Sequence, residues 1–467
     1  RKTKKEERDP KIMSQQQQQE EQLPVIISGA GPCGLVAALT LQKGGENKVP
    51  FIMIEKAERK RFCSDVGSGF DLAPTAVDIL KNRLQVPDLD AVLGRSAAMH
   101  MNDMNGNVVR ELKLSDISKE LDFASASRAG LQQALMNALT KDQTEDDIHQ
   151  FLRCGIEVTG YEEEESSVTV QLSDGSSIKG CALLGCDGIH SRVRKCMVDK
   201  RNQKNDGKKK KKDDDALRFC NTTCWWGKTT IKEGSDLHMK LNETQNFKEE
   251  GVSFVWSLGT HKQPGSFMVA PIGGGDTIAW ALFMKSKEPP IRGNDLVRRG
   301  GFTLQEKEKE ELEQIVANRF ETMKYAVRAT DASSITKVGL FDRGGANNNK
   351  IPFANGQHVA LLGDAAHPQS PFMGQGVNMA ITDAYVCATL LHRNIMMGGS
   401  GVPKALNEYN SDTRRKSVNK VVNQARTYGD LCVSKNRFTC WMFRALMHWT
   451  PMSWVISDMM KGDDSNH

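Results

Sequence analysis

The sequence predicts an α/β protein in which a Rossmann-like nucleotide-binding domain carries an inserted mixed or antiparallel β-sheet domain and a C-terminal helical region. Two observations predict this fold. A strand, a glycine-rich turn, a helix and a second strand follow one another within residues 23–55. Strand-like segments then fill residues 216–345, after which residues 346–395 return to a buried apolar strand, a glycine loop and a helix.

The first stretch has the spacing of a dinucleotide-binding βαβ unit. Gly29, Gly31 and Gly34 form the pattern G-x-G-x-x-G between an apolar strand and an apolar helix. The first glycine permits a tight turn, the second lets the backbone approach a pyrophosphate, and the third lets the helix pack closely on the strand. Glu55 ends the next strand, 21 residues after Gly34, where an acidic residue is expected to bind a ribose hydroxyl. We therefore interpret the triplet as a nucleotide site.

Composition shifts and turn signals divide the 467 residues into eight segments. We expect, in order, a disordered tail (1–22), the nucleotide-binding domain (23–96), an excursion into the sheet domain (97–125), a second part of the nucleotide-binding domain (126–198), a low-complexity surface insert (199–215), the sheet domain, which would bind the substrate (216–345), a third part of the nucleotide-binding domain (346–395) and the C-terminal helical region (396–467). Asn105-Gly106 and Asp174-Gly175 each predict a hairpin, and residues 305–326 predict one polar helix.

Charge and cysteine usage exclude several classes of function. The net charge is +5, but residues 1–12 and 199–215 contribute +3 each, so the rest of the chain carries −1 and gives no reason to expect a nucleic-acid partner. The eleven cysteines are scattered through the sequence, and no set of cysteine pairs or histidine cluster completes a metal site. We expect reduced thiols, no metal and a cytoplasmic location. Nothing before Leu23 has the apolar core of a signal peptide.

Two apolar features have two interpretations each. Residues 438–460 are apolar but interrupted by Arg444, His448 and Pro451, which favours a packed helix over a membrane contact. Four tryptophans lie in the predicted sheet domain, and we favour core positions over substrate platforms for them: Trp225, Trp226, Trp256 and Trp280.

The second stretch with chemical content is GDAAHPQSPFMGQGVNMAITDA. Asp364 stands at the carboxyl end of a predicted parallel strand, the position at which open α/β sheets bind their ligands. Its carboxylate can accept hydrogen bonds from ribose or ribityl hydroxyls. A glycine loop over residues 371–376 then precedes a helix, whose N-terminus would favour negative charge on a bound group.

These motifs together resemble the aromatic-hydroxylase family of FAD-dependent (class A) flavoprotein monooxygenases. The resemblance rests on GAGPCG with Glu55, on SRAGL with Arg128, on GCDGIHSRVR with Asp187 and on the GDAAH segment, which occur in the family's order. It covers about residues 23–391. The last segment is most similar to tetracycline-degrading, ubiquinone-hydroxylase-like and salicylate-hydroxylase-like members, and the residues do not distinguish among these three.

The resemblance implies a role for each motif residue. The three glycines would hold the FAD pyrophosphate, and Glu55 would hold the adenosine ribose. Arg128 would contact the phosphate or ribityl region, and Asp187 would help to place FAD and admit NAD(P)H; an ordinary surface or helix-capping charge is the alternative for both. Asp364 would bind the ribityl chain.

The remaining implied positions lie around the flavin ring. Pro371, Gly374 and Gly376 would border the isoalloxazine. His367 lies beside this loop, and we favour a structural role for it over that of a catalytic base. No other catalytic residue is assigned, because the flavin itself carries the chemistry.

The resemblance implies an oxidoreductase in which NAD(P)H reduces FAD and O₂ adds to form a flavin hydroperoxide. One oxygen atom would then pass to a hydrophobic or aromatic small molecule, by hydroxylation or epoxidation. Alternatives on the same fold are a reductase, a dehydrogenase, a halogenase, or an FAD-binding protein without oxygenase activity. Trp225-Trp226-Gly227 does not supply the W-x-W-x-I-P motif expected of a tryptophan-halogenase-like enzyme. The choice between NADPH and NADH stays open.

Overall fold

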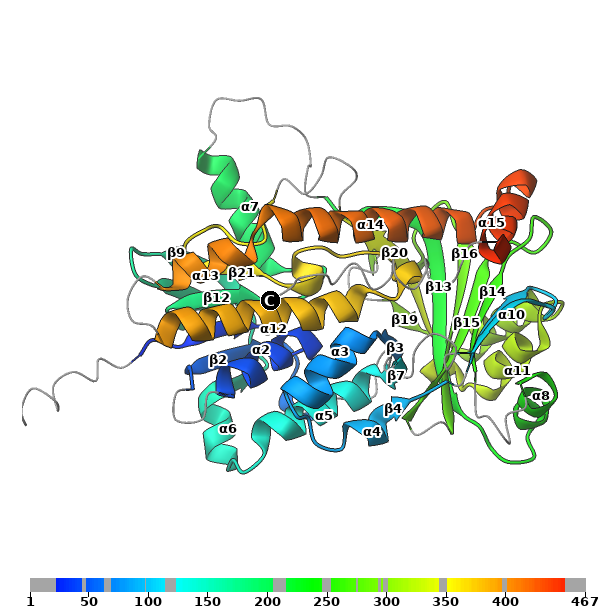
Figure 1. Ribbon diagram of the computed structural model, residues 1–467, viewed down its shortest axis with the longest axis horizontal. Coiled ribbons are helices and arrows are strands. Elements are labelled where there is room, and N and C mark those ends of the chain that lie inside the picture. The colour runs from blue at the N-terminus through cyan, green and yellow to red at the C-terminus, as the bar shows by residue number, and fades with distance from the viewer. Residues whose placement is uncertain are drawn as a thin grey trace, which may run out of the picture.

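The computed structural model describes residues 22–43, 48–62, 69–96, 98–113, 123–204, 216–245, 253–273, 276–292, 295–296, 301–343, 351–396 and 401–449. The expectations for the tail before residue 22, for most of the Lys/Asp-rich insert and for the segment after residue 449 lie outside these residues. Figure 1 shows a parallel sheet with its helices at one end of the molecule, a large sheet at the other end, and the long helix α14 running across both.

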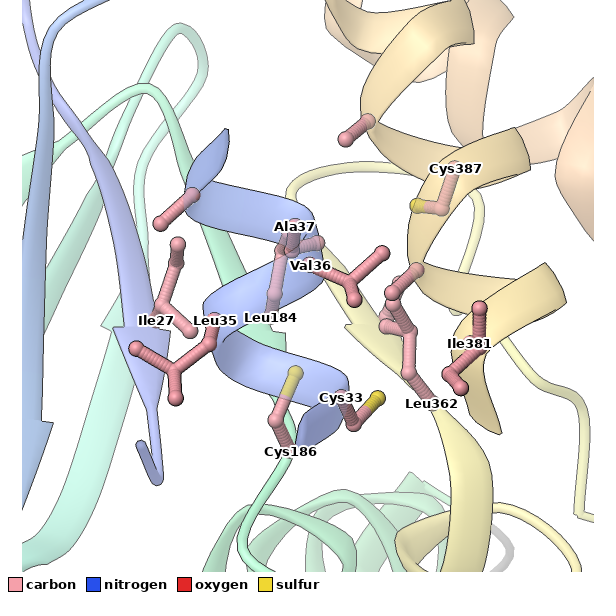
Figure 2. Packing of buried hydrophobic residues seen from close by; sticks show 14 of the residues in the cluster. Ile27, Cys33, Leu35, Val36, Ala37, Leu184, Cys186, Leu362, Ile381 and Cys387 are labelled. Atoms are coloured by element: carbon pink, nitrogen blue, oxygen red, sulfur yellow. The ribbon is translucent and has the colours of Figure 1, made fainter. Parts of the chain in front are cut away.

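The parallel sheet is the Rossmann-like core. Its strand order is β21-β12-β1-β2-β8, and every neighbouring pair is parallel. The strands are β1 (Val25–Ser28), β2 (Phe51–Glu55), β8 (Leu152–Cys154), β12 (Ala182–Gly185) and β21 (Val359–Leu361). These strands are almost continuously apolar because helices cover the sheet. The covering helices include α2 (Pro32–Gln42), α5 (Arg128–Thr140) and α12 (Gly376–Met396). Figure 2 shows Leu35 of α2 beside Ile27 of β1 in this core.

The large sheet has eight strands in the order β19-β20-β13-β16-β15-β14-β5-β6. All neighbours are antiparallel except β14 and β5, so the sheet is mixed. The strands are β5 (Ala98–Asp103), β6 (Val108–Lys113), β13 (Arg218–Thr230), β14 (Phe254–Leu258), β15 (Ser266–Ile272), β16 (Thr277–Lys285), β19 (Phe302–Thr303) and β20 (Thr336–Asp342). The hairpin predicted at Asn105-Gly106 joins β5 to β6.

The two faces of the large sheet pack against different partners. The outer face buries apolar side chains of α8 (Asp236–Gln245), α10 (Glu306–Val316) and α11 (Glu321–Ala329). The inner face packs against the 3₁₀ turn η8 (Pro371–Met373), the helix α14 (Asp412–Cys432) and the helix α15 (Arg437–Trp449). The inner face is therefore the one that meets the Rossmann-like core.

The prediction of one helix over residues 305–326 is wrong, because the structure has two. α10 ends at Val316 and α11 begins at Glu321. Between them Phe320 leaves the helical conformation and is buried against the β5–β6 turn, where a Cβ on Gly106 would lie 2.5 Å from its ring. Arg319 donates to Pro264 O at 3.2 Å. Burial of one aromatic ring thus interrupts a sequence whose local propensity is helical throughout.

Besides one two-stranded pair, the remaining strands form two three-stranded antiparallel sheets. One contains β3 (Gly69–Leu72), β7 (Ala124–Ser127) and β4 (Leu93–Gly94), and the other contains β9 (Val158–Glu163), β10 (Val168–Leu172) and β11 (Ser177–Gly180), with the predicted hairpin at Asp174-Gly175. Strand β17 (Ile291–Arg292) pairs antiparallel with β18 (Asp295–Leu296).

The remaining helices and turns are η2 (Arg59–Arg61), α3 (Pro74–Asp78), η3 (Ile79–Arg83), α4 (Leu89–Val92), α6 (Glu145–Phe151), α7 (Arg192–Lys204), η6 (Ala332–Ser334), η7 (Gly363–Ala365) and α13 (Gly401–Tyr409).

A buried carboxylate fixes α14 to the large sheet. Asp342, 1% exposed, ends β20 and accepts a hydrogen bond from Arg218 of β13 at 2.9 Å and one from Arg426 of α14 at 3.0 Å. Two guanidinium groups compensate for the cost of burying this charge. Among the residues that the structure describes, no helix is both long and apolar enough to cross a membrane.

Candidate active site

The predicted cofactor residues gather at one edge of the parallel sheet. Because neighbouring strands are parallel, their carboxyl ends meet there, and they lead into Gly29, Glu55, Asp187 and Asp364. The chain runs from β1 to β2 on one side and later adds β12 and β21 on the other side. The edge therefore includes a topological switch point, the position at which open α/β sheets bind nucleotides.

The glycine turn leaves no room for side chains on its protein side. Gly29 has φ +100°, and a Cβ there would lie 2.5 Å from Cys186 O in the loop after β12. A Cβ on Gly34 would lie 2.0 Å from Gly29 O. At Gly31, by contrast, no atom lies within 4 Å of the Cβ position. Gly31 is also the N-cap of α2, which has no side-chain cap and no acidic residue in its first turn. The turn therefore presents a helix N-terminus to open space, which fits a pyrophosphate.

Glu55 is held in place by the same turn. Its Oε2 accepts the Ala30 N–H at 2.8 Å, and its Oε1 accepts the Ala57 N–H at 2.8 Å. From α5, the Gln132 amide donates to Ala30 O at 2.9 Å. A carboxylate oxygen can accept more than one hydrogen bond, so this orientation leaves acceptor capacity for a ribose hydroxyl.

Asp187 caps a helix and retains one unused oxygen. Its Oδ2 accepts the N–H groups of Arg192 at 2.7 Å and Val193 at 3.2 Å, at the start of α7. Its Oδ1 is buried without a hydrogen-bond partner among the described residues. Burial raises the pKa of Asp187, although the Ser191 hydroxyl and the backbone N–H groups act in the opposite direction. The structure thus supports the capping role directly, and the second oxygen is compatible with a cofactor contact.

Asp364 and Arg128 interact electrostatically at this edge. Both side chains are exposed to solvent. The protein that surrounds Asp364 nevertheless desolvates its carboxyl and raises its pKa, while interactions with His367 and Arg128 lower this pKa. Arg128, the first residue of α5, follows the N-cap Ser127 directly. An accessible carboxyl within electrostatic range of an accessible guanidinium fits the polyhydroxyl and phosphate groups of FAD.

The glycine loop before α12 is tied to β3. Gly374 has φ +62°, and no atom lies within 4 Å of the Cβ position of Gly376. Asn378, in the first turn of α12, accepts the Ala73 N–H at 2.8 Å and donates to Asp71 O at 2.9 Å and Gly374 O at 2.7 Å. Asn378 was not predicted from the sequence, because its partners Asp71 and Ala73 lie about 300 residues earlier in the chain.

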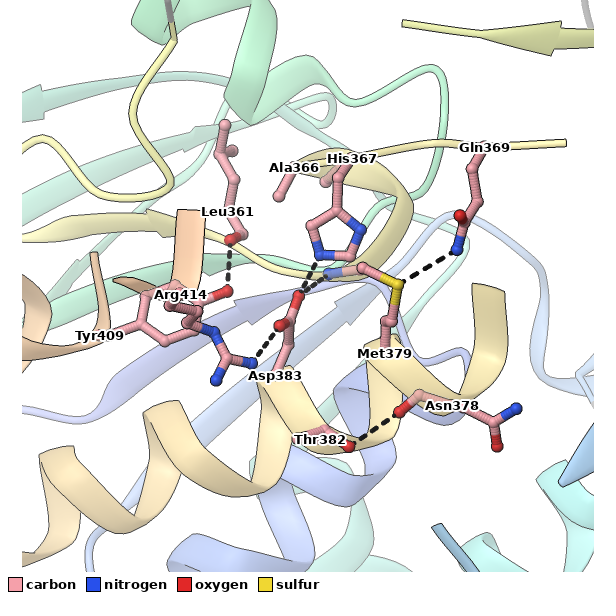
Figure 3. Close-up of polar contacts among 12 residues, drawn as sticks. Leu361, Ala366, His367, Gln369, Asn378, Met379, Thr382, Asp383, Tyr409 and Arg414 are labelled. Carbon is pink, nitrogen blue, oxygen red and sulfur yellow. Dashed lines mark hydrogen bonds and ion pairs between the residues drawn. The ribbon is translucent and has the colours of Figure 1, made fainter. Parts of the chain in front are cut away.

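The loop between β21 and η8 is stabilised by the buried carboxylate of Asp383 (Figure 3). Its Oδ2 accepts the Gly363 N–H at 2.9 Å and lies 2.6 Å from His367 Nε2, and its Oδ1 pairs with Arg414 of α14. Asp383 and His367 side chains are each 1% exposed. Burial alone would raise the pKa of Asp383, but His367 and Arg414 outweigh it and hold this pKa well below its usual range. Because its Nε2 is engaged by Asp383, the geometry favours the structural role for His367.

Arg194 joins the second motif to the third. Its guanidinium is 2% exposed and donates from Nη1 to Ala365 O at 3.0 Å and to Ala366 O at 2.7 Å. This role of Arg194 was not predicted from the sequence. The available signal was an arginine in GCDGIHSRVR on the buried side of α7, next to the buried Val193.

One tryptophan differs from the other three in the large sheet. Trp225, Trp256 and Trp280 are buried, and the indole N–H groups of Trp256 and Trp280 donate to Ser266 and Thr330. These three are core residues. Trp226 is only partly buried on the inner face, and its Nε1 has no acceptor among the described residues.

Trp226 belongs to a partly exposed apolar patch, Trp226–Ala281–Met268, formed by register neighbours on three adjacent strands. Ala281 of β16 is paired with Trp226 of β13 and with Met268 of β15, and all three are half-buried. Along β16, Phe283 contacts Phe372 of η8 with ring centroids 4.8 Å apart. On the other side of Ala281, the Ala279 Cβ lies 3.1 Å from the Cβ position of Gly69 in β3. The patch therefore lies on the inner face of the sheet, between the contact with η8 and the contact with β3.

A titratable carboxyl lies beside the glycine loop. Asp71 follows Gly69 by two residues and so shares its face of β3. Its Oδ1 accepts a hydrogen bond from Ser125 at 2.9 Å, and its Oδ2 lies 3.8 Å from the Cβ position of Gly374. Burial raises the pKa of Asp71, and the Ser125 hydrogen bond lowers it. No sequence motif marked this residue.

We predict that Asp383→Asn lowers the free energy of unfolding at pH 7 by about 3 kcal/mol, because Arg414 loses its buried counter-charge. The folded-state pKa of Asp383 is depressed, so its carboxylate stabilises fully above about pH 4, the ordinary aspartate value, and less at lower pH. Urea unfolding over a pH series should therefore show the difference between wild type and variant shrinking below about pH 4.

The control is Glu408→Gln, which breaks the exposed pair with Arg393 and should cost less than about 1 kcal/mol. A difference between Asp383→Asn and wild type that is independent of pH down to acid unfolding would contradict the ion-pair interpretation.

Comparison with known families and proteins agrees with this geometry. The family described as "FAD binding domain" matches residues 22–210 and 230–425. The chain is 25% identical to the aurachin C monooxygenase/isomerase of Stigmatella aurantiaca, over 91% of this chain and 94% of the relative. It is also 25% identical to 3-hydroxybenzoate 6-hydroxylase 1 of Aquipseudomonas alcaligenes, over 79% of this chain and 81% of the relative.

Solved structures show the same fold. Klebsiella pneumoniae HpxO, crystallised with FAD and uric acid, superposes with a TM-score of 0.72 at 19% identity, covering 94% of this chain and 96% of that one. A substrate complex of salicylate hydroxylase superposes with a TM-score of 0.69 at 20% identity, covering 95% and 98%. The chain belongs to the FAD-binding, class A aromatic-hydroxylase family of FAD-dependent monooxygenases.

Proposed function

We propose that this enzyme inserts one oxygen atom from O₂ into a hydrophobic aromatic small molecule that packs against the Trp226–Ala281–Met268 patch. The observation that carries the proposal is this patch, whose three side chains are only half-buried while their strand neighbours Cys224, Phe283 and Trp256 are buried. FAD, when bound, supplies the transfer of reducing equivalents from NAD(P)H and the activation of O₂. The protein binds, orients and dehydrates the reactants.

The cofactor roles follow from the open positions at the sheet edge. Gly29, Gly31 and Gly34 would hold the pyrophosphate at the N-terminus of α2, and Glu55 would accept from the adenosine ribose. Arg128 and Asp364 would bind the phosphate and ribityl portions. Pro371, Gly374 and Gly376 would border the isoalloxazine, and the N-terminus of α12 would favour negative charge there.

The proposal is tested on purified protein by its visible spectrum and by oxidation of NADPH and NADH, with and without phenolic, quinoid and polyene compounds. We expect flavin absorption near about 450 nm and compound-stimulated oxidation that yields an oxygenated product. Protein that takes up no flavin after reconstitution with FAD would contradict the proposal. Bound flavin without stimulation by any compound would instead favour a reductase or dehydrogenase.

Asp364→Ala should weaken FAD binding by about tenfold to a hundredfold, because it removes hydrogen bonds between a carboxylate and cofactor hydroxyls. The dissociation constant is measured by flavin fluorescence during reconstitution of the apoprotein. Asp276→Ala, at an exposed carboxyl before β16, is the matched control and should bind FAD like the wild type. Equal affinity in Asp364→Ala would remove Asp364 from the site.

Ala281→Leu should raise KM for the stimulating compound by roughly tenfold, because the added side chain occupies the proposed substrate space. FAD absorption and unstimulated NAD(P)H oxidation should not change. Ala317→Leu, at an exposed position after α10, serves as the control. An unchanged KM in Ala281→Leu would place the substrate elsewhere.

Asp71 is proposed as the group that accepts a proton from a substrate hydroxyl. Since burial raises its pKa, kcat/KM should fall in the wild type as the pH drops through that raised pKa. Asp71→Asn should be slower and lack this acid limb. Ser125→Ala, which removes the hydrogen bond that lowers the pKa, should shift the limb to higher pH. An acid limb that persists unchanged in Asp71→Asn would exclude this role.

A further inference from the structure

Helix α15 lies at the outer end of the molecule (Figure 1), and it exposes an apolar face. Half of the exposed large hydrophobic side chains in the described part of the chain belong to this one helix: Phe438, Trp441, Met442, Leu446 and Trp449. Trp449 is 80% exposed, and Phe438 and Trp441 are 66% and 65% exposed. Single exposed hydrophobic residues are ordinary on protein surfaces, but a contiguous group marks an interaction site.

The opposite face fixes the helix firmly to the large sheet. Cys440, Phe443 and Met447 are buried, at a spacing of three and four residues. Arg110 of β6 donates to Met447 O at 3.1 Å and to His448 O at 3.3 Å, at the C-terminal end of α15. With about 100° of rotation per residue, the five exposed apolar side chains point away from this buried face. The apolar face is therefore held outward by tertiary contacts.

Basic residues flank the apolar face. Lys435 and Arg437 are exposed at the start of α15, and Arg444 lies along its side, 3.6 Å from Asp103 of β5. The sequence contains no acidic residue between Asp430 and Asp458. A helix with tryptophan and phenylalanine on one face and basic residues along its border is typical of peripheral binding to an anionic lipid surface.

Helix α15 packs on the sheet with one face, as its sequence predicted, and we propose that its other face docks the enzyme on the surface of an anionic phospholipid bilayer, the contact that the sequence had not favoured. Trp441 and Trp449 would lie at the headgroup level with Phe438, Met442 and Leu446 directed toward the acyl chains, and the basic residues would contact lipid phosphates. A second copy of the chain fits this face less well, because an isologous contact would bring the same basic border against itself. This inference does not depend on the proposed substrate site.

The test is flotation of the full-length FAD-bound protein with phosphatidylcholine vesicles, with and without phosphatidylserine. We expect binding to the anionic vesicles, weakened by salt, with a blue shift of tryptophan emission. The triple variant Phe438→Ser, Trp441→Ser, Trp449→Ser should bind at least roughly tenfold less, and Arg437→Glu should also bind less. The matched control Met239→Ser, Ile315→Ser changes exposed apolar side chains on α8 and α10 and should bind like the wild type.

Flavin absorption and NAD(P)H oxidation in solution should be the same in all variants, which separates a lost docking surface from misfolding. No binding of the wild type to either vesicle, or equal binding by the triple variant, would overturn the proposal. The proposal would also be overturned if the wild type formed a dimer in sedimentation velocity, the triple variant did not, and no vesicle binding were observed. None of these measurements depends on catalytic turnover. A result that overturns the docking proposal is therefore distinct from a result that contradicts the proposed function.

Discussion

The candidate cofactor edge depends on the close approach of three backbone turns that have no space for side chains. Gly29 lies against Cys186 O, and Gly34 lies against Gly29 O. Gly363, with φ +55°, lies where a Cβ would be 2.8 Å from the Cβ of Ala380 in α12 and 3.5 Å from Cys33 Sγ. Close approach brings the N-termini of α2 and α12 to the same edge of one sheet, so their dipoles can act on one extended ligand. A side chain at Gly29 or Gly34 would push apart backbone segments that must lie close together to form the site.

Buried ion pairs act together with apolar packing to set the relation between this edge and the large sheet. Helix α14 contributes Arg414 to Asp383 near the start of the helix and Arg426 to Asp342 farther along it. Between these two contacts Ala425 O accepts the Ser370 hydroxyl at 3.0 Å, next to η8. Removing a partner of either carboxylate would lower the stability of the folded protein, because a buried charge would remain uncompensated. The helix thus fixes how far the glycine loop lies from the inner face of the sheet, and hence the size of the space between them.

Local signals predicted the Rossmann-like core well and the large sheet only in outline. The glycine pattern, its flanking strands and the loop before α12 are contiguous in sequence, so period and spacing were sufficient. The break between α10 and α11 was missed because it depends on Phe320 packing against a turn some 210 residues earlier. For the same reason Trp226 could not be separated from Trp225, since strand register decides which of two neighbours faces inward. Arg194, Asn378 and Asp71 act through partners distant in sequence, and no local pattern reveals such contacts.

The Trp226–Ala281–Met268 patch and the buried side of helix α15 lie on the same inner face of the large sheet. Met268 is paired with Trp256 on the next strand, and the ring of Trp256 lies 6.4 Å from that of Phe443 on the buried face of α15. Helix α15 therefore covers the sheet immediately beside the patch. A molecule apolar enough to pack on Trp226 also partitions into lipid, because both depend on removing apolar surface from water. An enzyme docked through α15 would hold its proposed substrate site close to the lipid, in which such a molecule is most concentrated. Docking would therefore explain why this helix lies beside the patch.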